Sequence, residues 1–416
     1  MKAHPSRLNV SQQGALALGD LAWSNVAVQQ RIGQCGGVQV TIAAMNRFAE
    51  NAGCQQKCAL ALGNFACQED NQVKIAQLDG ISSIIATMDK HCNHQLCLQY
   101  CCWALKNLSL NEANKKRIAS GRAPRLIVEA LRNYPWHAGI VEESCGCIRK
   151  LVWGNAENQN RIAMEGGIEA IINGMTMHVP KASVQQQCGL ALGDLAWSNE
   201  SNQDRIGRAG GIPPIIAGMH AHPTHSGTQG GLALGNLASL CTPNRKLIAL
   251  AGGIPAICKS MKTNLQYPGV QVLPMPPSPL PSFSPHAPIH THTHTHTHTM
   301  YTCMYRKRVH PRVAMLPART QPPPSAWRLT LHMMAAWVHT HTHARTHTHA
   351  HTHTHTHTHM QEYGCWALRH LALDPECKHI ALREGAPQIM RQGMQEYPNR
   401  TGVQEQASYA LKNLLS

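Results

Sequence analysis

The stretch ALGDLAWSN occurs twice in the sequence, at residues 17–25 and again at 191–199. Six related stretches complete the series: ALGNFACQE, ALKNLSLNE, IRKLVWGNA, ALGNLASLC, ALRHLALDP and ALKNLLS. Their first large apolar residues are Leu18, Leu62, Leu105, Ile148, Leu192, Leu234, Leu368 and Leu411. All intervals but one are 42 to 44 residues long. This period predicts a helical solenoid whose repeats bury their apolar faces against one another.

Each repeat is expected to contain three helices. The first is short and carries one residue of an isoleucine series: Ile32, Ile75, Ile118, Ile162, Ile206, Ile248 and Ile380. Glycine follows soon after, as in RIAMEGGI at 161–168, and glycine can adopt the left-handed conformation that caps a helix. Pro213 and Pro255 mark the start of a second helix. The pattern VQxxxxxAL then opens a third, longer helix.

These residues resemble the armadillo repeat family, in which a short helix precedes a longer antiparallel pair. The resemblance covers the chain except residues 272–361, and it extends to protist armadillo arrays and the armadillo region of leucine-rich-repeat kinases. It implies an all-α solenoid, a right-handed superhelix of three-helix repeats. We therefore expect residues 1–271, with a truncated first repeat, to continue into residues 362–416 as one solenoid.

The long interval contains a low-complexity insert. Leu234 and Leu368 are 134 residues apart, and removing residues 272–361 leaves 44. Alternating Thr-His is what a CA dinucleotide repeat encodes, a Val272 codon begins with GT, and a Gln361 codon can end in AG. We interpret the insert as translated intron, which would be disordered if made. The alternative is a histidine-rich loop that binds zinc or nickel.

Composition argues against several classes of partner. The net charge is +15, but the insert carries 7 Lys/Arg and no Asp/Glu, so the other 326 residues carry 30 Lys/Arg against 22 Asp/Glu. That is a weak basis for a nucleic acid or membrane partner. The basic run at 306–308 lies inside the insert and does not decide localisation. Without a signal sequence or a long apolar span, we expect a cytoplasmic protein, with the nucleus as a further option.

The cysteines are expected to be reduced core residues. Cys58, Cys101 and Cys188 share one position, four residues before the apolar residue of the motif, where helices must approach closely. No cysteine pair has the spacing of a structural zinc site, so we expect neither a metal nor a cofactor.

The two ends of the chain lack the polar caps that solenoids normally have. Residues 1–25 can be laid over 175–199, at an offset of 174 residues or four repeats. We therefore expect a segment of a longer array or an incomplete gene model. The chain itself is expected to be a monomer or part of such an array.

The candidate site follows from the family resemblance. It implies that the third helices line a groove in which asparagines hydrogen-bond an extended peptide. An asparagine amide both donates and accepts, so it can pair with any peptide backbone. The alternative is that asparagine satisfies local polar groups near a helix end. The matching ladder position, two residues after the motif apolar residue, reads Asp20, Asn64, Asn107, Lys150, Asp194, Asn236, His370 and Asn413.

Tryptophans suggest a second, adaptor-like function. Importin-alpha-type adaptors pair the asparagine with a tryptophan four residues earlier, and here only Trp103 with Asn107 completes that pattern, while Trp366 precedes His370. Such a groove binds basic cargo through cation–π contacts. Asp20 and Asp194 would favour that cargo locally, and Lys150 would repel it.

Trp23, Trp153 and Trp197 form another set, each five residues after the motif apolar residue. We expect them to pack under the following turn, and the alternative is that they anchor an interface. The sequence contains no kinase signature and no metal-ligand or triad-like histidine spacing. The prediction is therefore a non-catalytic scaffold that binds a protein or peptide, with the adaptor for basic cargo as the alternative.

Overall fold

The structure is a computed structural model that describes residues 1–224, 226–265 and 359–416. These residues belong to one compact unit, and a second unit, Gly269–His353, lies outside them. The predicted insert therefore also lies outside the described residues, apart from its last three. Within the described ranges all regular secondary structure is helical, and no helix is long and apolar enough to cross a membrane.

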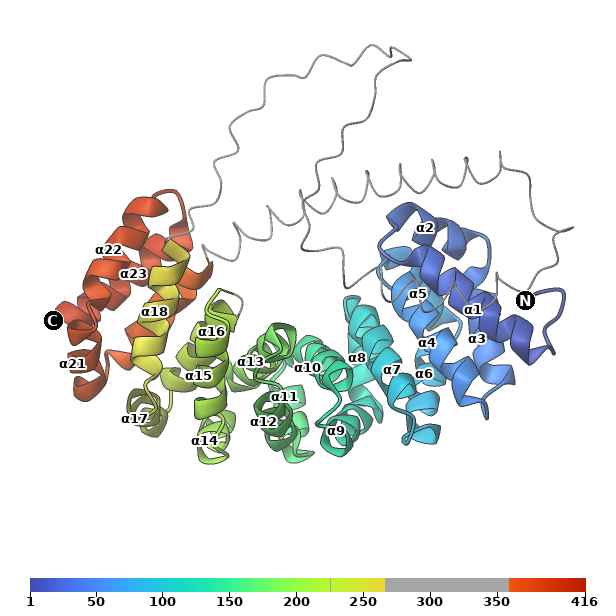
Figure 1. Ribbon diagram of the computed structural model, residues 1–416, viewed down its shortest axis with the longest axis horizontal. Helices are drawn as coiled ribbons and strands as arrows, with labels where there is room; N and C mark the ends of the chain where they lie inside the picture. Colours follow the sequence, from blue (N-terminus) through green and yellow to red (C-terminus); the bar gives the residue numbers. More distant parts are fainter. Residues whose placement is uncertain (225, 266–358) are drawn as a thin grey trace, which may run out of the picture. The chain divides into compact units, whose positions relative to one another are not determined.

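Three kinds of helix alternate along the compact unit and stack in chain order (Figure 1). The first helices are α2 (Val26–Gln34), α5 (Glu69–Gln77), α8 (Glu112–Ser120), α11 (Ala156–Met164), α14 (Glu200–Arg208), α17 (Thr242–Leu250) and α21 (Pro375–Arg383). The second helices are α3 (Gly37–Arg47), α6 (Gly80–Lys90), α9 (Ala123–Asn133), α12 (Gly167–Met177), α15 (Ile212–Ala221), α18 (Gly253–Leu265) and α22 (Ala386–Glu396). The third helices are α1 (Leu8–Ala22), α4 (Ala52–Phe65), α7 (Gln95–Leu108), α10 (Ala138–Val152), α13 (Ala182–Ala196), α16 (Ser226–Ser239), the helix over 359–371, and α23 (Thr401–Leu415).

The corner between first and second helices forms as the glycine pattern predicts. Gly166 has φ +84° and Gly210 has φ +75°, the left-handed conformation that ends a helix with little strain only for glycine. In several repeats the first helix starts at a polar cap. For example, Asn155 accepts a hydrogen bond from the backbone N–H of Asn158 at 2.9 Å. The predicted three-helix repeat is therefore confirmed.

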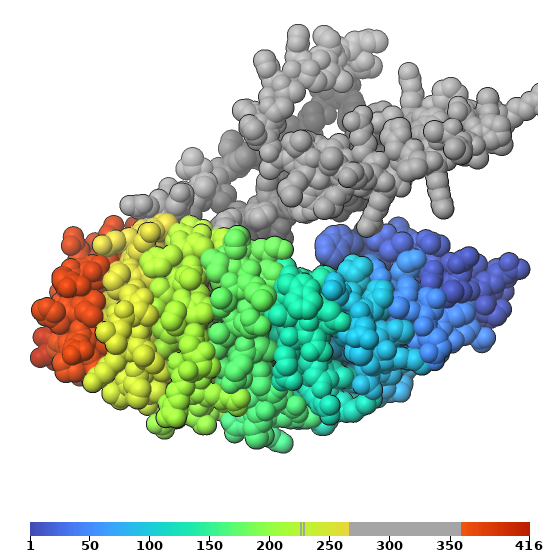
Figure 2. Space-filling view, turned by 60° about the horizontal axis from the view of Figure 1, so that its bottom comes forward, coloured from blue at the N-terminus to red at the C-terminus, as the bar shows by residue number. Residues whose placement is uncertain are grey.

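The third helices pack directly on their neighbours and form the centre of the core. The motif residues Leu62, Leu105 and Leu192 are fully buried there. Close approach requires small residues, since a Cβ on Gly193 would come 3.2 Å from the Cα of Ala233 on the next third helix. The described cysteines are thiols, and most are buried, as predicted. Colour bands in chain order show that each repeat contacts its neighbours along the unit (Figure 2).

A second contact joins the first helices of successive repeats. In three of the described repeats the basic residue just before the isoleucine of this helix donates to a carbonyl near the end of the preceding first helix. Lys74 Nζ donates to the carbonyl of Gly33 at 2.7 Å, Arg117 to that of Ala76 at 3.1 Å, and Arg161 to that of Ala119 at 2.5 Å. A cation at a helix C-terminus also interacts favourably with the helix dipole. The basic residue before the isoleucine is thus an inter-repeat connection in these repeats.

The repeat register continues across the gap between 265 and 359. Gln185 Nε2 donates to the carbonyl of Met175 at 2.7 Å, ten residues earlier. Gln361 makes the equivalent bond to Met261 at 2.9 Å, one hundred residues earlier. The offset of 90 residues equals the length of the predicted insert. It supports our proposal that residues 1–271 and 362–416 form one solenoid.

Removing residues 272–361 should leave the array intact and stabilise it. Gln271 would then take the position of Gln361, and the connection after Leu265 would shrink from 93 to 3 residues. Loop closure costs about 0.6 kcal/mol per doubling of length, so the free energy of unfolding should rise by roughly 3 kcal/mol in urea titrations. In the deletion protein, Gln271→Ala should lose about 1–2 kcal/mol, because it leaves the Met261 carbonyl unpaired. A deletion protein without helical structure would contradict the continuous register.

Candidate peptide-binding groove

Ladder asparagines hold neighbouring third helices together. Their Nδ2 groups donate to the carbonyl one residue after the motif apolar residue of the preceding repeat. The bonds, of 2.9 to 3.0 Å, are Asn64 to Gly19, Asn107 to Gly63, Asn236 to Gly193 and Asn413 to Arg369.

Helix ends explain why these carbonyls need a donor. The N–H of Trp23, four residues after Gly19, bonds to Asp20 instead, and the N–H of Cys67 bonds to Asn64. The carbonyls of Gly19 and Gly63 thereby lose their partners within the helix. The amide N–H groups of the ladder thus satisfy polar groups near a helix end, as the alternative interpretation held, and the Oδ1 atoms are what a ligand could use. Peptide binding by the ladder stays a prediction.

Other ladder positions carry charged or ionisable groups. Asp20 is exposed on α1, and Lys150 is half-buried on α10. The Asp194 side chain is 4% exposed, with Oδ2 3.4 Å from Nε of Arg149. Burial raises the pKa of the Asp194 carboxyl to about 6, although Arg149 opposes the shift. Burial likewise lowers the pKa of the Lys150 ammonium, and the neighbouring Arg149 lowers it further.

His370 is a neutral member of the ladder. Both of its ring nitrogens are buried and find no hydrogen-bond partner among the described residues. Burial, with Arg369 and Arg245 nearby, lowers the pKa of the imidazole to about 4. The ring packs edge-on against Trp366, with 4.3 Å between ring centroids.

The two predicted groove tryptophans lie across the preceding repeat. Trp366 donates from Nε1 to Oδ1 of Asn236 at 3.3 Å. Its ring covers Gly235, and the ring of Trp103 covers Gly63, so a side chain on either glycine would collide with the indole. The buried Nε1 of Trp103 has no partner within the described part of the chain. Each tryptophan therefore contacts the asparagine-bearing helix before its own.

The tryptophans that end the third helices form exposed stacks beside the ladder. Trp197 stacks with Trp153 at 6.4 Å between centroids and with Trp366 at 5.9 Å, at interplanar angles of 24° and 28°. The ring centroids of Trp23 and Trp103 are 6.3 Å apart, with the two rings tilted by 31°. Trp23, Trp153 and Trp197 are 60%, 59% and 39% exposed. The expectation that they pack under the following turn is therefore wrong, because each lies at the helix end with a large part of its surface exposed.

Basic residues lie over the same rings, a feature that sequence reasoning missed. Lys106 Nζ is 4.2 Å from the centroid of Trp103, and the guanidinium of Arg369 is 4.4 Å from that of Tyr409. The signal was present one residue before the ladder position, which holds glycine in four repeats and a basic residue in four. The basic residues are Lys106, Arg149, Arg369 and Lys412.

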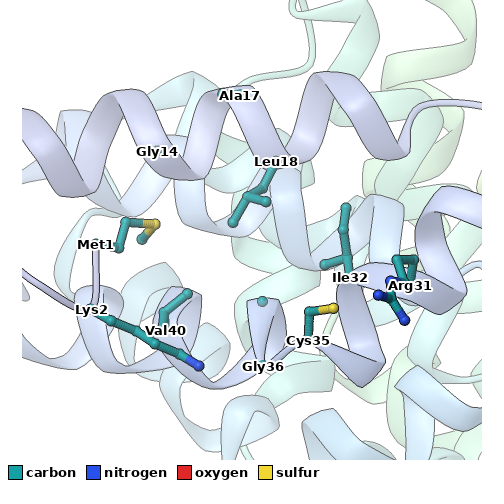
Figure 3. Close-up of a pocket in the computed structure, with 11 residues that line it drawn as sticks. Met1, Lys2, Gly14, Ala17, Leu18, Arg31, Ile32, Cys35, Gly36 and Val40 are labelled. Atoms are coloured by element: carbon teal, nitrogen blue, oxygen red, sulfur yellow. The ribbon is translucent and has the colours of Figure 1, made fainter.

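A separate pocket of about 470 Å³ lies between α1, α2 and α3 (Figure 3). Its lining is mainly apolar, with Leu18, Ile32 and Val40 from the three helices. In later repeats the second helix of the preceding repeat fills the corresponding space. For example, a Cβ added to Gly211 would lie 3.2 Å from the Ile172 side chain of α12. No ladder residue lines this pocket.

Comparison with known proteins shows similarity in fold only. No family model and no curated protein matches the sequence. A structure from a study of a phosphorylation switch in the interaction between cadherin and beta-catenin is 13% identical, with a TM-score of 0.55, and the match covers 100% of this chain and 77% of that one. An engineered protein is 19% identical over 56% of this chain and 93% of its own, with a TM-score of 0.50. A designed armadillo repeat protein in complex with the peptide (KR)4 is 14% identical over 56% of this chain and 100% of its own, at a TM-score of 0.46.

The chain has an armadillo-type repeat fold. The three-helix repeats and the row of third helices agree with the resemblance drawn from the motif.

Asn236→Ala should destabilise the protein more than Asn413→Ala. The first change leaves both the Gly193 carbonyl and the Trp366 indole N–H without their partner, at a cost of about 3 kcal/mol. Asn413 is half-buried, so water can replace its bond, and the cost should be about 1 kcal/mol. Urea unfolding of both variants measures the difference. Equal losses would show that the amide does not connect the two repeats.

Asp194 should make stability depend on pH. Its folded pKa is about 6, raised above the ordinary 3.8, so its stabilising contribution is complete below pH 3.8 and is lost as pH rises through 6. Relative to Asp194→Asn, the free energy of unfolding should therefore fall by about 3 kcal/mol between pH 4 and pH 7. His370 has the opposite effect, present above pH 6.5 and lost toward pH 4, but both proteins share it. If the free energies of unfolding of the protein and of Asp194→Asn differ by the same amount at pH 4 and at pH 7, the burial of an ionised Asp194 is contradicted.

Proposed function

We propose that this chain is a non-catalytic scaffold that binds an extended peptide segment of another protein along its row of third helices. The observation that carries the proposal is the stack of Trp153, Trp197 and Trp366 beside the ladder, in which Trp153 and Trp197 are exposed and Trp366 is half-buried. Exposed indoles in a contiguous row are unusual on a surface without a partner, and tryptophan is enriched among residues that dominate binding energy.

The ladder supports an extended ligand. Asn64 and Asn107 use Nδ2 for the fold, and no donor among the described residues bonds to their Oδ1 atoms. These atoms recur at the repeat spacing and can accept backbone N–H groups from a peptide of any sequence. The structure similar in fold from the study of cadherin and beta-catenin is consistent with a protein partner for this chain.

The adaptor for basic cargo is disfavoured by the groove itself. Lysine recognition by stacked tryptophans needs free ring faces. Here Lys106 lies over Trp103, and Arg369 lies 5.8 Å from the centroid of Trp366. The chain thus supplies its own cations at the two tryptophans of the adaptor-like pattern.

A displayed library of random peptides should yield binders to the full chain that protect its third helices. The measurement is amide hydrogen exchange with and without a selected peptide. Protection is expected at the C-terminal turns of α10, α13 and α16, because the ladder and the stacked rings lie there. The second helices, such as α12 and α15, serve as the internal control. Protection confined to those second helices would contradict a groove on the third helices.

A further inference from the structure

The groove has one feature that selects the chemistry of its ligand. We propose that the stack of Trp153, Trp197 and Trp366 is an anchor subsite for an aromatic side chain of an acidic, extended peptide. This inference rests on the proposed peptide-binding function. It concerns Trp153 and Trp197 at the ends of their helices, together with Trp366 of the helix over 359–371, and none of the three is a ladder position.

Stacked indoles form the surface of this subsite. Trp197 stacks with Trp153 from the preceding repeat and with Trp366 from a later one. Trp197 and Trp153 keep 39% and 59% of their surface exposed. An indole edge carries the positive end of the ring quadrupole, and it attracts the face of another aromatic ring or an oxygen with negative charge. A lysine stem or a guanidinium would instead need an open face.

The fixed charges around the stack also favour a ligand with negative charge. Lys150 is half-buried on the same helix as Arg149, and burial and then Arg149 lower the pKa of its ammonium, although Asp194 opposes the shift. Arg369 lies over Trp366. The acidic group at this part of the ladder, Asp194, is 4% exposed in its side chain and faces Arg149. A ligand therefore meets more positive than negative charge, which favours carboxylates on both sides of the aromatic anchor.

A single-stranded nucleic acid is the competing ligand, since bases also stack on aromatic rings near cations. A base stacks on a ring face, and Trp197 already stacks with two indoles, at 5.9 and 6.4 Å between ring centroids. The geometry thus favours the peptide over the nucleic acid.

The test uses the full chain and a fluorescein-labelled decapeptide of alternating Asp and Glu with one central Phe, measured by fluorescence anisotropy. A peptide with Leu in place of Phe, a Lys/Arg peptide with the same Phe, and a uridine decamer are the comparisons. The Phe peptide should bind most tightly. Trp197→Ala should weaken it by about 30-fold, the effect of an interface hot spot, and Lys150→Gln by about threefold at low salt.

Matched variants separate anchoring from general effects. Trp136 is 59% exposed and packs against Tyr134 at the opposite end of α10, so Trp136→Ala should change affinity less than twofold. Lys116 is exposed on α8 and serves as the control for Lys150. Tighter binding of the Lys/Arg peptide or the uridine decamer, or affinity for the Phe peptide that survives Trp197→Ala, would overturn the inference. Neutral or basic display-selected peptides that protect α13 and α16 would overturn it while leaving the proposed function intact. If no peptide protects the third helices, both fail.

Discussion

Direct packing of each third helix on the next is the constraint on which the rest of the structure depends. The contact requires small residues such as Gly19 and Gly193. A Cβ added to either glycine would lie 3.2 Å from the Cα of an alanine on the next third helix. Helices this close leave no room for water between the carbonyls at their ends, so the next repeat must supply a donor. The ladder asparagine is that donor. One contact therefore explains the alanine, glycine and asparagine of the motif ALGN.

The same constraint links stability to the candidate groove. The amide N–H of the asparagine is used between repeats, which leaves the oxygens of Asn64 and Asn107, the exposed indoles and the basic residues beside them for the proposed ligand. Asp194 and His370 depart from the ladder in opposite ways: burial favours the protonated carboxyl of one and the neutral imidazole of the other. The ladder is thus first a structural element, and the proposed recognition depends mainly on the side chains around it.

Much of the fold could be predicted from the sequence, because a repeat shows the same physical solution several times. The 43-residue period, the glycine corners and the small core cysteines all appear in the structure. The offset of 90 residues between Gln361 and its carbonyl partner also agrees with the register drawn from Leu234 and Leu368. The insert itself lies outside the described residues, and its origin stays a hypothesis.

The site was harder to predict, because burial and partners depend on neighbouring repeats. Trp23, Trp153 and Trp197 recur at one position, yet periodicity does not show whether a residue beyond a helix end packs inward or outward. Similarly, the position before the ladder holds glycine in some repeats and a basic residue in others, and the structure shows what the basic residue contacts, as where Lys106 lies over Trp103. A pattern identifies equivalent positions, and the structure shows what each position contacts.

The most direct test of this account is exciton-coupled circular dichroism of the tryptophans in the full chain. The Trp197 ring contacts indoles from both sides of the gap between 265 and 359, so the signal reports the continuous array and the exposed stack together. We predict a couplet that weakens in Trp197→Phe and Trp366→Phe and is unchanged in Trp136→Phe. A couplet that does not respond to Trp197→Phe would mean that the stack, and with it the join between the two parts of the solenoid, does not form.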